Sequence, residues 1–556
     1  MMNKWKWLQR RSAGCWKPEN GMWNMDNVIS FEKISKWPES KSGLLYIICI
    51  SVILKAFLFA SDSMINNDGL LYIAAAQDFA AGHFKEGLSV FPMPFYPLLI
   101  AIIHFLIPDW AAAARVISVT FIVFTLIPLY LLTKELFGRK AAFWACLAFA
   151  IAPFPNSLAD SIIRDPGFIF CTAWAVYFAL RSSQSPRIIL FAATAFFSLV
   201  SMLFRIEGIM LILFFPTYFL VLSYIKNQER APLLKGALLF IVIPLLLVIV
   251  FSVCRFNDTV SFNRSDYIYA EFQKLFKIEF LNNYYALSEQ LKNLVQSSPS
   301  PGFKNNFAEI AKHYVPVIYF LGLTETLIVN LFPIFIIPLF FSFKEPIKIK
   351  HVFVLGVLSV FILLAYYFLI KNDFLTSRYI STPVLLTYPW IGAGIHRFFE
   401  YLSGKLFKKV FVIIFLLFII SPVYKCVEQE MKEDNSLIVA AKWIENNPDA
   451  GKLKIITGDK RFLFYAGREY WVKNVFSGIS GDAYYSLYNK DASYNELERI
   501  AMENKFDLVF LRVSLKKEAP RFKYFKKIKE FKGRKNISYL FSSPEVAQIL
   551  GSNIVE

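Results

Sequence analysis

Residues 112–140 read AAARVISVTFIVFTLIPLYLLTKELFGRK, an apolar run that ends in a short basic segment. The apolar part, residues 112–136, is long enough to cross the hydrocarbon core of a bilayer as a helix, which takes about 20 residues. The segment FGRK (137–140) follows at once, and Lys and Arg gather in short loops on the cytoplasmic side of membrane proteins. This stretch therefore predicts a membrane-spanning helix and the side on which it ends.

Runs of this kind recur along the chain, which has 556 residues, 56% of them hydrophobic. A soluble protein does not repeat nearly uncharged runs of about 15 to 20 residues, whose length matches the hydrocarbon core. We therefore predict a polytopic α-helical membrane protein with about 11 transmembrane helices. The apolar runs are residues 44–61, 112–136, 141–155, 167–180, 188–204, 209–225, 235–254, 315–342, 351–370, 380–396 and 409–424.

The loops between these runs alternate in charge, which predicts the topology. One set is short and basic, as cytoplasmic loops are, and comprises FGRK (137–140), RSSQSPR (181–187), IKNQERAPLLK (225–235), FKEPIKIKH (343–351) and HRFFEYLSGKLFKK (396–409). The other set then lies outside, so the N-terminus is expected inside and the C-terminus outside. The proline-flanked segment PFYPLLIAIIHFLIPD (94–109) is expected as a juxtamembrane helix on the outer surface, because a span there would invert every later loop.

Three parts follow from this topology. We expect a cytosolic tail at residues 1–42, a transmembrane domain at residues 43–425 with external loops 62–111 and 255–314, and an extracytoplasmic domain at residues 426–556. In the last part, SLIVAAKWIENN and YNELERIAMEN have the pattern of helices, whereas KLKIITG and FDLVFLRV have that of strands. Helices that alternate with strands predict a small α/β domain.

The composition argues against two other classes of protein. The formal charge of +18 comes largely from the short basic loops, and no basic groove or recognition motif indicates nucleic-acid binding. The six cysteines have no metal-type spacing and indicate no disulfide framework. No cofactor is required by the sequence, although the acidic residues leave a divalent metal open.

Charged residues, and one tyrosine, gather in the segments predicted to lie outside. They are Asp68, Asp78 and Lys85 in the first loop, Arg164 and Asp165 in LADSIIRDPG, Arg205 and Glu207 in FRIEG, and Arg378 and Tyr379 in KNDFLTSRY. Arginines on this side go against the usual charge bias, so we expect a specific anionic partner. Acids and arginines at a membrane–water boundary suit a lipid-phosphate substrate and a hydroxyl group that must be deprotonated.

Each of these residues also has a simpler interpretation. Asp68 would cap an external helix, and Asp78 would lie on a solvated helix face. The 164–165 pair would be an interface ion pair, the 205–207 segment a turn that snorkels to the interface, and the 378–379 pair an interfacial anchor. The convergence of all of them on one face favours a functional site.

Four stretches resemble polyprenyl-phosphate-dependent glycosyltransferases of the C superfamily, above all the protein O-mannosyltransferase and lipid A aminoarabinose transferase group. They are NNDGLLYIAAAQDFAAGHF (66–84), PFYPLLIAIIHFLIPD, the region from LYLLTKELFGRK (129–140) to SIIRDPGFIFCTAWAVYFALR (161–181), and FRIEGIML with the late SRYISTPVLLTYPW (377–390). The chain departs from many relatives at one position, where Gly69 follows Asp68 in place of a second acid.

The resemblance implies a multi-pass enzyme of the bacterial inner membrane whose active site faces the periplasm. It would move a single sugar, with inversion, from a polyprenyl-phosphate donor to a hydroxyl on a lipid, glycan or protein acceptor. Asp68 would be the general base, and Asp165, Asp78 and Glu207 would orient other groups or contact the acceptor. The donor phosphate would bind Arg378 and Arg164, then Tyr379, Lys85 and Arg205, because a guanidinium fork grips phosphate oxygens in pairs.

Two other functions stay open from the sequence. One is an oligosaccharyltransferase or glycan ligase that uses a pyrophosphate carrier. The other is a transporter or flippase for a lipid-linked glycan, although its charges would be expected in mid-span along a pathway. The sequence identifies neither the sugar nor the acceptor.

Overall fold

A computed structural model describes most of the chain. The described residues are 42–59, 64–240, 242, 281–296, 303–344, 346–403, 408–431, 434–447, 449–468, 483–484 and 492–549. The predicted cytosolic tail, most of the apolar run 235–254 and the first half of the external loop 255–314 lie outside these residues.

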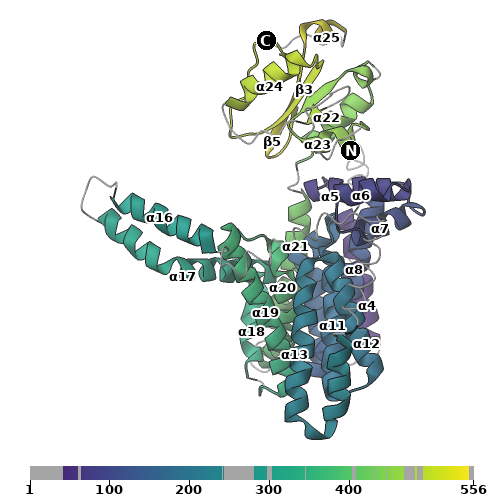
Figure 1. Cartoon of the computed structure of the whole chain (residues 1–556), viewed down its shortest axis with the longest axis vertical. Helices are drawn as coiled ribbons and strands as arrows, with labels where there is room; N and C mark the ends of the chain where they lie inside the picture. The colour runs from purple at the N-terminus through teal and green to yellow at the C-terminus, as the bar shows by residue number, and fades with distance from the viewer. Residues whose placement is uncertain are drawn as a thin grey trace, which may run out of the picture.

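The described residues up to Met431 form, for the most part, a helical bundle (Figure 1). Its main helices are α4 (Gly43–Phe59), α8 (Trp110–Phe137), α9 (Arg139–Ile151), α10 (Pro153–Asp160), α11 (Asp165–Gln184), α12 (Ile188–Phe204), α13 (Ile209–Ile225), α17 (Phe303–Leu331), α18 (Pro333–Ser342), α19 (Ile349–Asn372), α20 (Ser381–Ser403) and α21 (Lys408–Met431). Large apolar side chains, among them Phe149, Phe215 and Tyr388, are fully buried between them. The bundle is therefore held together by packing of apolar helix faces.

The bundle is that of a multi-pass membrane protein. Among the described residues, five helices are long and apolar enough to cross a membrane, or six if the bent pair α9–α10 is one span. Several other apolar helices, α4 and α12 among them, are shorter than the usual span. The prediction of a polytopic helical membrane protein is confirmed at this level, and the number eleven and the topology stay predictions.

Two apolar runs that we expected to be single spans are broken, and proline explains both breaks. The run 141–155 divides into α9 and α10, which meet at an angle of 52° just before Pro153. The run 315–342 divides into α17 and α18 at Phe332, whose φ of 67° ends the helix before Pro333. A proline ring disfavours the helical conformation of the residue before it, so each break lies one residue upstream of the ring.

Helix α17 also begins in the segment that we assigned to the external loop 255–314. It pairs with α16 (Asn282–Gln296), and the two helices project from the side of the bundle as an arm (Figure 1). Residues 297–302, between the two helices, lie outside the described residues.

Three short helices lie at one end of the bundle: α5 (Asn67–Ala80), α6 (Phe84–Val90) and α7 (Phe95–His104) (Figure 1). The last of these occupies the proline-flanked segment that we expected as a juxtamembrane helix, and at ten residues it is too short to span. Helix α5 packs on both α6 and α7. This layer positions the start of α5, where Asp68 lies.

The residues after α21 form an α/β unit above the same end of the bundle (Figure 1). Its sheet has the strand order β2-β1-β3-β5-β4, with parallel pairs at β1 and antiparallel pairs between β3, β5 and β4. The strands are β1 (Ile455–Thr457), β2 (Ala483–Tyr484), β3 (Leu508–Ser514), β4 (Lys526–Lys532) and β5 (Asn536–Ser542), and the helices are α22 (Ser436–Glu445), α23 (Lys460–Tyr465), α24 (Ala492–Glu503) and α25 (Pro544–Ile549). The β4–β5 hairpin is an element that the sequence pattern did not predict.

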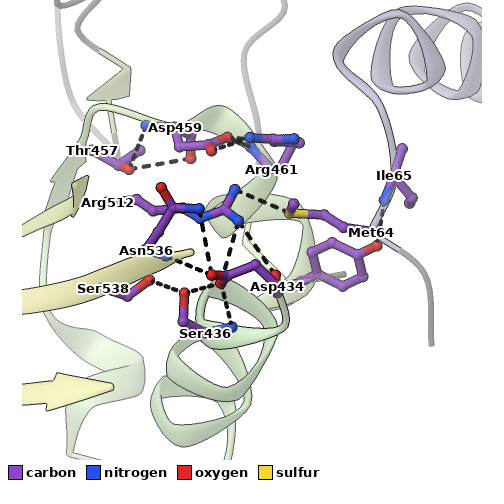
Figure 2. Close-up of polar contacts among 11 residues, drawn as sticks. Met64, Ile65, Asp434, Ser436, Thr457, Asp459, Arg461, Arg512, Asn536 and Ser538 are labelled. Atoms are coloured by element: carbon purple, nitrogen blue, oxygen red, sulfur yellow. Dashed lines mark hydrogen bonds and ion pairs between the residues drawn. The ribbon is translucent and has the colours of Figure 1, made fainter. Parts of the chain in front are cut away.

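Asp434 organises the beginning of this unit (Figure 2). Its carboxylate accepts hydrogen bonds from the Ser436 hydroxyl at 2.6 Å and from the backbone N–H groups of Lys535 and Asn536 at 2.7 Å each. Arg512 of β3 forms an ion pair with it at 3.4 Å. Burial opposes ionisation of Asp434, but these hydrogen bonds outweigh it and lower its pKa to about 2.

The unit also contacts the segment that leads into α5. The Tyr465 hydroxyl accepts a hydrogen bond from the backbone N–H of Ile65 at 2.8 Å, and the Arg512 guanidinium contacts the sulfur of Met64 (Figure 2). Ile65 lies three residues before Asp68, so the C-terminal unit holds the chain close to the first candidate residue.

Candidate functional site

A continuous chain of ion pairs joins four segments at the end of the bundle that carries α5. Asp68 pairs with Arg378, Arg378 with Asp165, Asp165 with Arg205, and Arg205 with Glu207. Five of the nine residues singled out from the sequence are therefore brought together, although 310 positions separate Asp68 from Arg378.

Asp68 lies in the first turn of α5 and is not the helix cap that the simpler interpretation assigned to it. The cap position is Asn66, so the Asp68 side chain is left to contact Nη1 of Arg378 at 2.5 Å. The adjacent Gly69 explains the missing second acid. A Cβ at that position would lie 2.9 Å from the Asn66 side chain and 3.0 Å from Ile162, so no larger side chain fits without movement.

Asp165 is the fully buried centre of the network. One carboxylate oxygen accepts from Nε of Arg378 at 3.0 Å, with Nη2 also at 3.0 Å, and the other accepts from Arg205. Burial alone would raise the pKa of this carboxyl, but the guanidinium groups of Arg205 and Arg378 outweigh it and hold the pKa below its ordinary value. We expected Asp165 to orient another group or to contact the acceptor; in the structure its carboxylate pairs with Arg205 and Arg378.

Arg205 and Glu207 form a closed turn between α12 and α13. Nε of Arg205 donates to the Glu207 carboxylate at 3.1 Å, and the short helix η2 (Ile206–Gly208) packs on the end of α12. A Cβ at Gly208 would lie 2.4 Å from the backbone nitrogen of Met202, so this close approach requires glycine.

The structure bears on two expectations for Arg205. The residue is 5% exposed, so its side chain does not snorkel to the interface. Its guanidinium is shared between Asp165 and Glu207, and its expected contact with the donor phosphate stays a prediction.

Tyr379 and Arg164 border the network without joining its ion pairs. Tyr379 lies on the short helix η5 (Ser377–Ile380), and its ring faces the Arg205 guanidinium at 5.2 Å. Arg164 lies over the Phe91 ring at 5.2 Å and contacts the sulfur of Met93. Its buried Nε has no hydrogen-bond partner in the part of the chain that the structure describes. Arg164 is thus a partly buried cation at the edge of the network, close enough to Asp165 to contribute to the lowered pKa of that carboxyl.

The structure does not bring Lys85 and Asp78 into this network. Lys85 is exposed on α6, and Asp78 is half-buried near the far end of α5. Burial raises the pKa of Asp78 above its ordinary value. Neither side chain contacts the ion-paired residues within the described ranges.

A cavity of about 610 Å³ opens beside Asp68 and Arg378. Its wall comes from the start of α5, from α10, from α17, from η5 and from α21. Most of its polar lining consists of amides and hydroxyl groups: Asn66, Asn67, Ser157, Ser161, Asn330, Ser377 and Gln429. Most of these residues lie in the segments predicted to be external, and sequence reasoning missed them because a neutral polar side chain there carries no signal by itself.

Lys460 is a second group that sequence reasoning missed. It begins α23, which packs against α5. Burial lowers the pKa of the Lys460 ammonium group, and the nearby Asp68 carboxylate partly offsets this effect. A cation from the C-terminal unit therefore lies near Asp68. Among the described residues, no group of three or more His, Cys, Asp or Glu side chains is arranged to hold a metal ion.

One comparison with known proteins agrees with the resemblance seen in the sequence. Residues 92–250 match the family model of the dolichyl-phosphate-mannose-protein mannosyltransferases. This match confirms the resemblance to glycosyltransferases of the C superfamily over that segment, which includes Arg164, Asp165, Arg205 and Glu207. No curated protein matches the chain by sequence.

Several solved structures are similar to the chain at low identity, AglB and ArnT among them. The archaeal oligosaccharyltransferase AglB from Archaeoglobus fulgidus, in complex with an inhibitory peptide and a dolichol-phosphate, has 15% identity and a TM-score of 0.46, with 87% of this chain and 70% of that chain covered. ArnT from Cupriavidus metallidurans, bound to undecaprenyl phosphate, has 12% identity and a TM-score of 0.49, with 90% of this chain and 98% of that chain covered.

Proposed function

From the family match over residues 92–250 and the ion-pair network at the end of the bundle, we propose that the chain is an integral membrane glycosyltransferase. It transfers a single sugar from a polyprenyl-phosphate donor to an acceptor hydroxyl, with inversion, on the extracytoplasmic face of the cytoplasmic membrane. The observation that carries this proposal is Arg378, which contacts both Asp68 and Asp165 and still exposes 28% of its side chain.

Asp68 is the general base in this proposal. The acceptor oxygen bonds to the anomeric carbon while the bond from that carbon to the phosphate oxygen breaks. The acceptor proton passes to the Asp68 carboxylate, and the electron pair of the broken bond stays on the phosphate. Proton transfer to a positioned side chain typically contributes about 10²–10⁴-fold in rate.

Arg378 and Arg164 hold the leaving phosphate. Negative charge grows on the phosphate oxygens as the bond breaks, and preorganised cations at such a position typically contribute about 10²–10³-fold each. Before the donor binds, Arg378 is paired with Asp68. A phosphate that takes over part of this guanidinium frees the Asp68 carboxylate for the acceptor hydroxyl.

Asp165, Arg205 and Glu207 are positioning residues. The buried Asp165 fixes Arg378 on one side, and Arg205 with Glu207 fixes Asp165 on the other. A guanidinium held in this way keeps its orientation when the phosphate arrives, so little reorganisation is needed at the moment of reaction. Tyr379 supports Arg205 through its ring.

The test is donor turnover by the purified protein in lipid. The wild-type protein is expected to convert a polyprenyl-phosphate sugar to free polyprenyl phosphate and to add the mass of one sugar to an acceptor. A product that carries a preassembled glycan would support the oligosaccharyltransferase alternative. Movement of an intact lipid-linked glycan between leaflets, without release of the carrier, would support the transporter alternative.

A further inference from the structure

The lining of the cavity beside Asp68 indicates which class of sugar the donor carries. We infer that the transferred glycosyl unit is uncharged, a neutral sugar in place of an amino sugar or a uronic acid. This inference rests on the proposed function, because it takes the cavity as the place where the sugar lies next to the phosphate-binding Arg378.

The charged groups of the cavity are already committed. Asp68 and Arg378 are the ionisable side chains that line it within the described residues. In the proposed reaction Arg378 binds the donor phosphate and Asp68 binds the acceptor hydroxyl, so neither is left to pair with a charge on the sugar. Arg378 is further engaged by Asp165. An ammonium group on the sugar would need a second carboxylate, and a carboxylate on the sugar would need a second cation. A charge that leaves water for the cavity without such a partner is disfavoured.

The remaining polar lining suits hydroxyl groups. Asn67 is exposed in the lining, so its amide can both donate to and accept from a ligand. Nδ2 of Asn330 already donates to the Thr326 carbonyl at 2.7 Å, which turns its Oδ1 into a fixed acceptor. Gln429 is exposed and offers both a donor and an acceptor.

The hydroxyl-bearing residues add to this pattern. Ser157 donates to the Phe154 carbonyl at 2.8 Å and Ser161 donates to the Ser157 carbonyl at 2.8 Å, so the oxygen of each keeps lone pairs for a ligand. The apolar part of the wall includes Phe154 and Val329. Neutral hydrogen-bonding groups beside apolar surface match a sugar that carries only hydroxyl groups. The volume of about 610 Å³ lies within the usual range of small-molecule sites.

The first experiment compares three donors that share one polyprenyl phosphate and differ in the sugar: a hexose, an amino sugar and a uronic acid. The purified full-length protein is expected to turn over the hexose donor at least about tenfold faster than either charged donor. A charged sugar would give up hydrogen bonds to water on entry and would find no charged partner in the cavity. Equal or faster turnover of a charged donor would overturn the inference and leave the proposed function intact. A protein that turns over and binds none of the three would overturn the proposed function and the inference with it.

The second experiment changes the charge of the cavity. Asn330→Asp and Gln429→Glu each add a carboxylate to the lining, and both are expected to shift the preference toward the amino-sugar donor by about tenfold. Asn372→Asp is the matched control, because Nδ2 of Asn372 donates to the Phe368 carbonyl at 3.0 Å in the same i to i−4 arrangement and the residue does not line the cavity.

Gln429 is exposed, so its variant keeps the test decisive if Asn330→Asp does not fold. If folded Gln429→Glu, judged by its thermal unfolding, keeps the wild-type ratio of the donors, the cavity does not bind the sugar and the inference is wrong. A change in the KM of the acceptor, with the donor ratio unaltered, would also contradict it.

Discussion

Replacement of Asp165 by asparagine tests the centre of the ion-pair network. Both oxygens of this fully buried carboxylate are in use, one by Arg205 and the other by Nε and Nη2 of Arg378 at 3.0 Å. An amide provides one acceptor for two guanidinium groups and directs N–H donors at the other. Removal of one partner from a buried ion pair typically costs about 3–5 kcal/mol.

The expected cost lies near the lower end of that range. Arg205 keeps Glu207 as a partner and Arg378 keeps Asp68, so neither guanidinium is left wholly unpaired. We therefore expect Asp165→Asn to lower the free energy of unfolding by about 3 kcal/mol, which is about a hundredfold in the unfolding equilibrium. Denaturant unfolding of the purified protein in detergent and lipid measures this change.

A surface ion pair provides the matched control. Glu229 pairs with Lys226 at 3.0 Å, and both side chains are about one third exposed. Glu229→Gln is expected to cost less than about 1 kcal/mol, because exposed ion pairs contribute little. If Asp165→Asn cost no more than Glu229→Gln, the buried network would not hold these helices together, and the positioning role of Asp165 would have to be abandoned.

Three further outcomes follow from the described contacts. The pKa of Asp434 is lowered from 3.8 to about 2 in the folded protein, despite burial. Ionised Asp434 therefore contributes about 2 kcal/mol to the free energy of unfolding above pH 3.8, and this contribution is lost as the pH falls from 3.8 toward 2. Unfolding measured across that window should depend more steeply on pH in the wild type than in Asp434→Asn, and identical slopes would contradict this. Tyr465→Phe removes the acceptor of the Ile65 N–H and is expected to lower kcat several-fold with an unchanged donor KM, whereas the exposed Tyr424→Phe changes neither. Arg164→Lys loses the planar fork and should raise the donor KM about tenfold in steady-state assays, so an unchanged KM would exclude Arg164 as a phosphate ligand.

The sequence predicted the parts of the fold that depend on local composition. The long apolar run that became α8 and the run that became α19 have the length and hydropathy of a span, and each extends to within a few residues of the expected ends. The breaks before Pro153 and Pro333 were missed, although the conformational restriction by proline is itself local. Both prolines were counted as part of an apolar run, which hid their effect.

The candidate site was predictable as a set of charges but not as a set of pairs. The FRIEG turn and the KNDFLTSRY segment marked Arg205, Glu207 and Arg378 because charged residues are costly at that boundary. Tertiary packing decides which of these residues pair. Asp68 and Arg378 lie 310 positions apart, so the sequence pattern does not show that they meet. The roles proposed for Arg205 and Arg378 differ for the same reason, because only the structure shows that Arg205 is buried and Arg378 is partly exposed.

The most direct test of the account is donor turnover by Asp68→Asn. Asn keeps the size of the side chain and removes the group that accepts the acceptor proton, so turnover of the polyprenyl-phosphate sugar should fall about 10²–10⁴-fold while the donor still binds. Asp78→Asn on the same helix, outside the ion-pair network, should keep wild-type turnover. Turnover by Asp68→Asn at the wild-type rate would show that Asp68 is not the base.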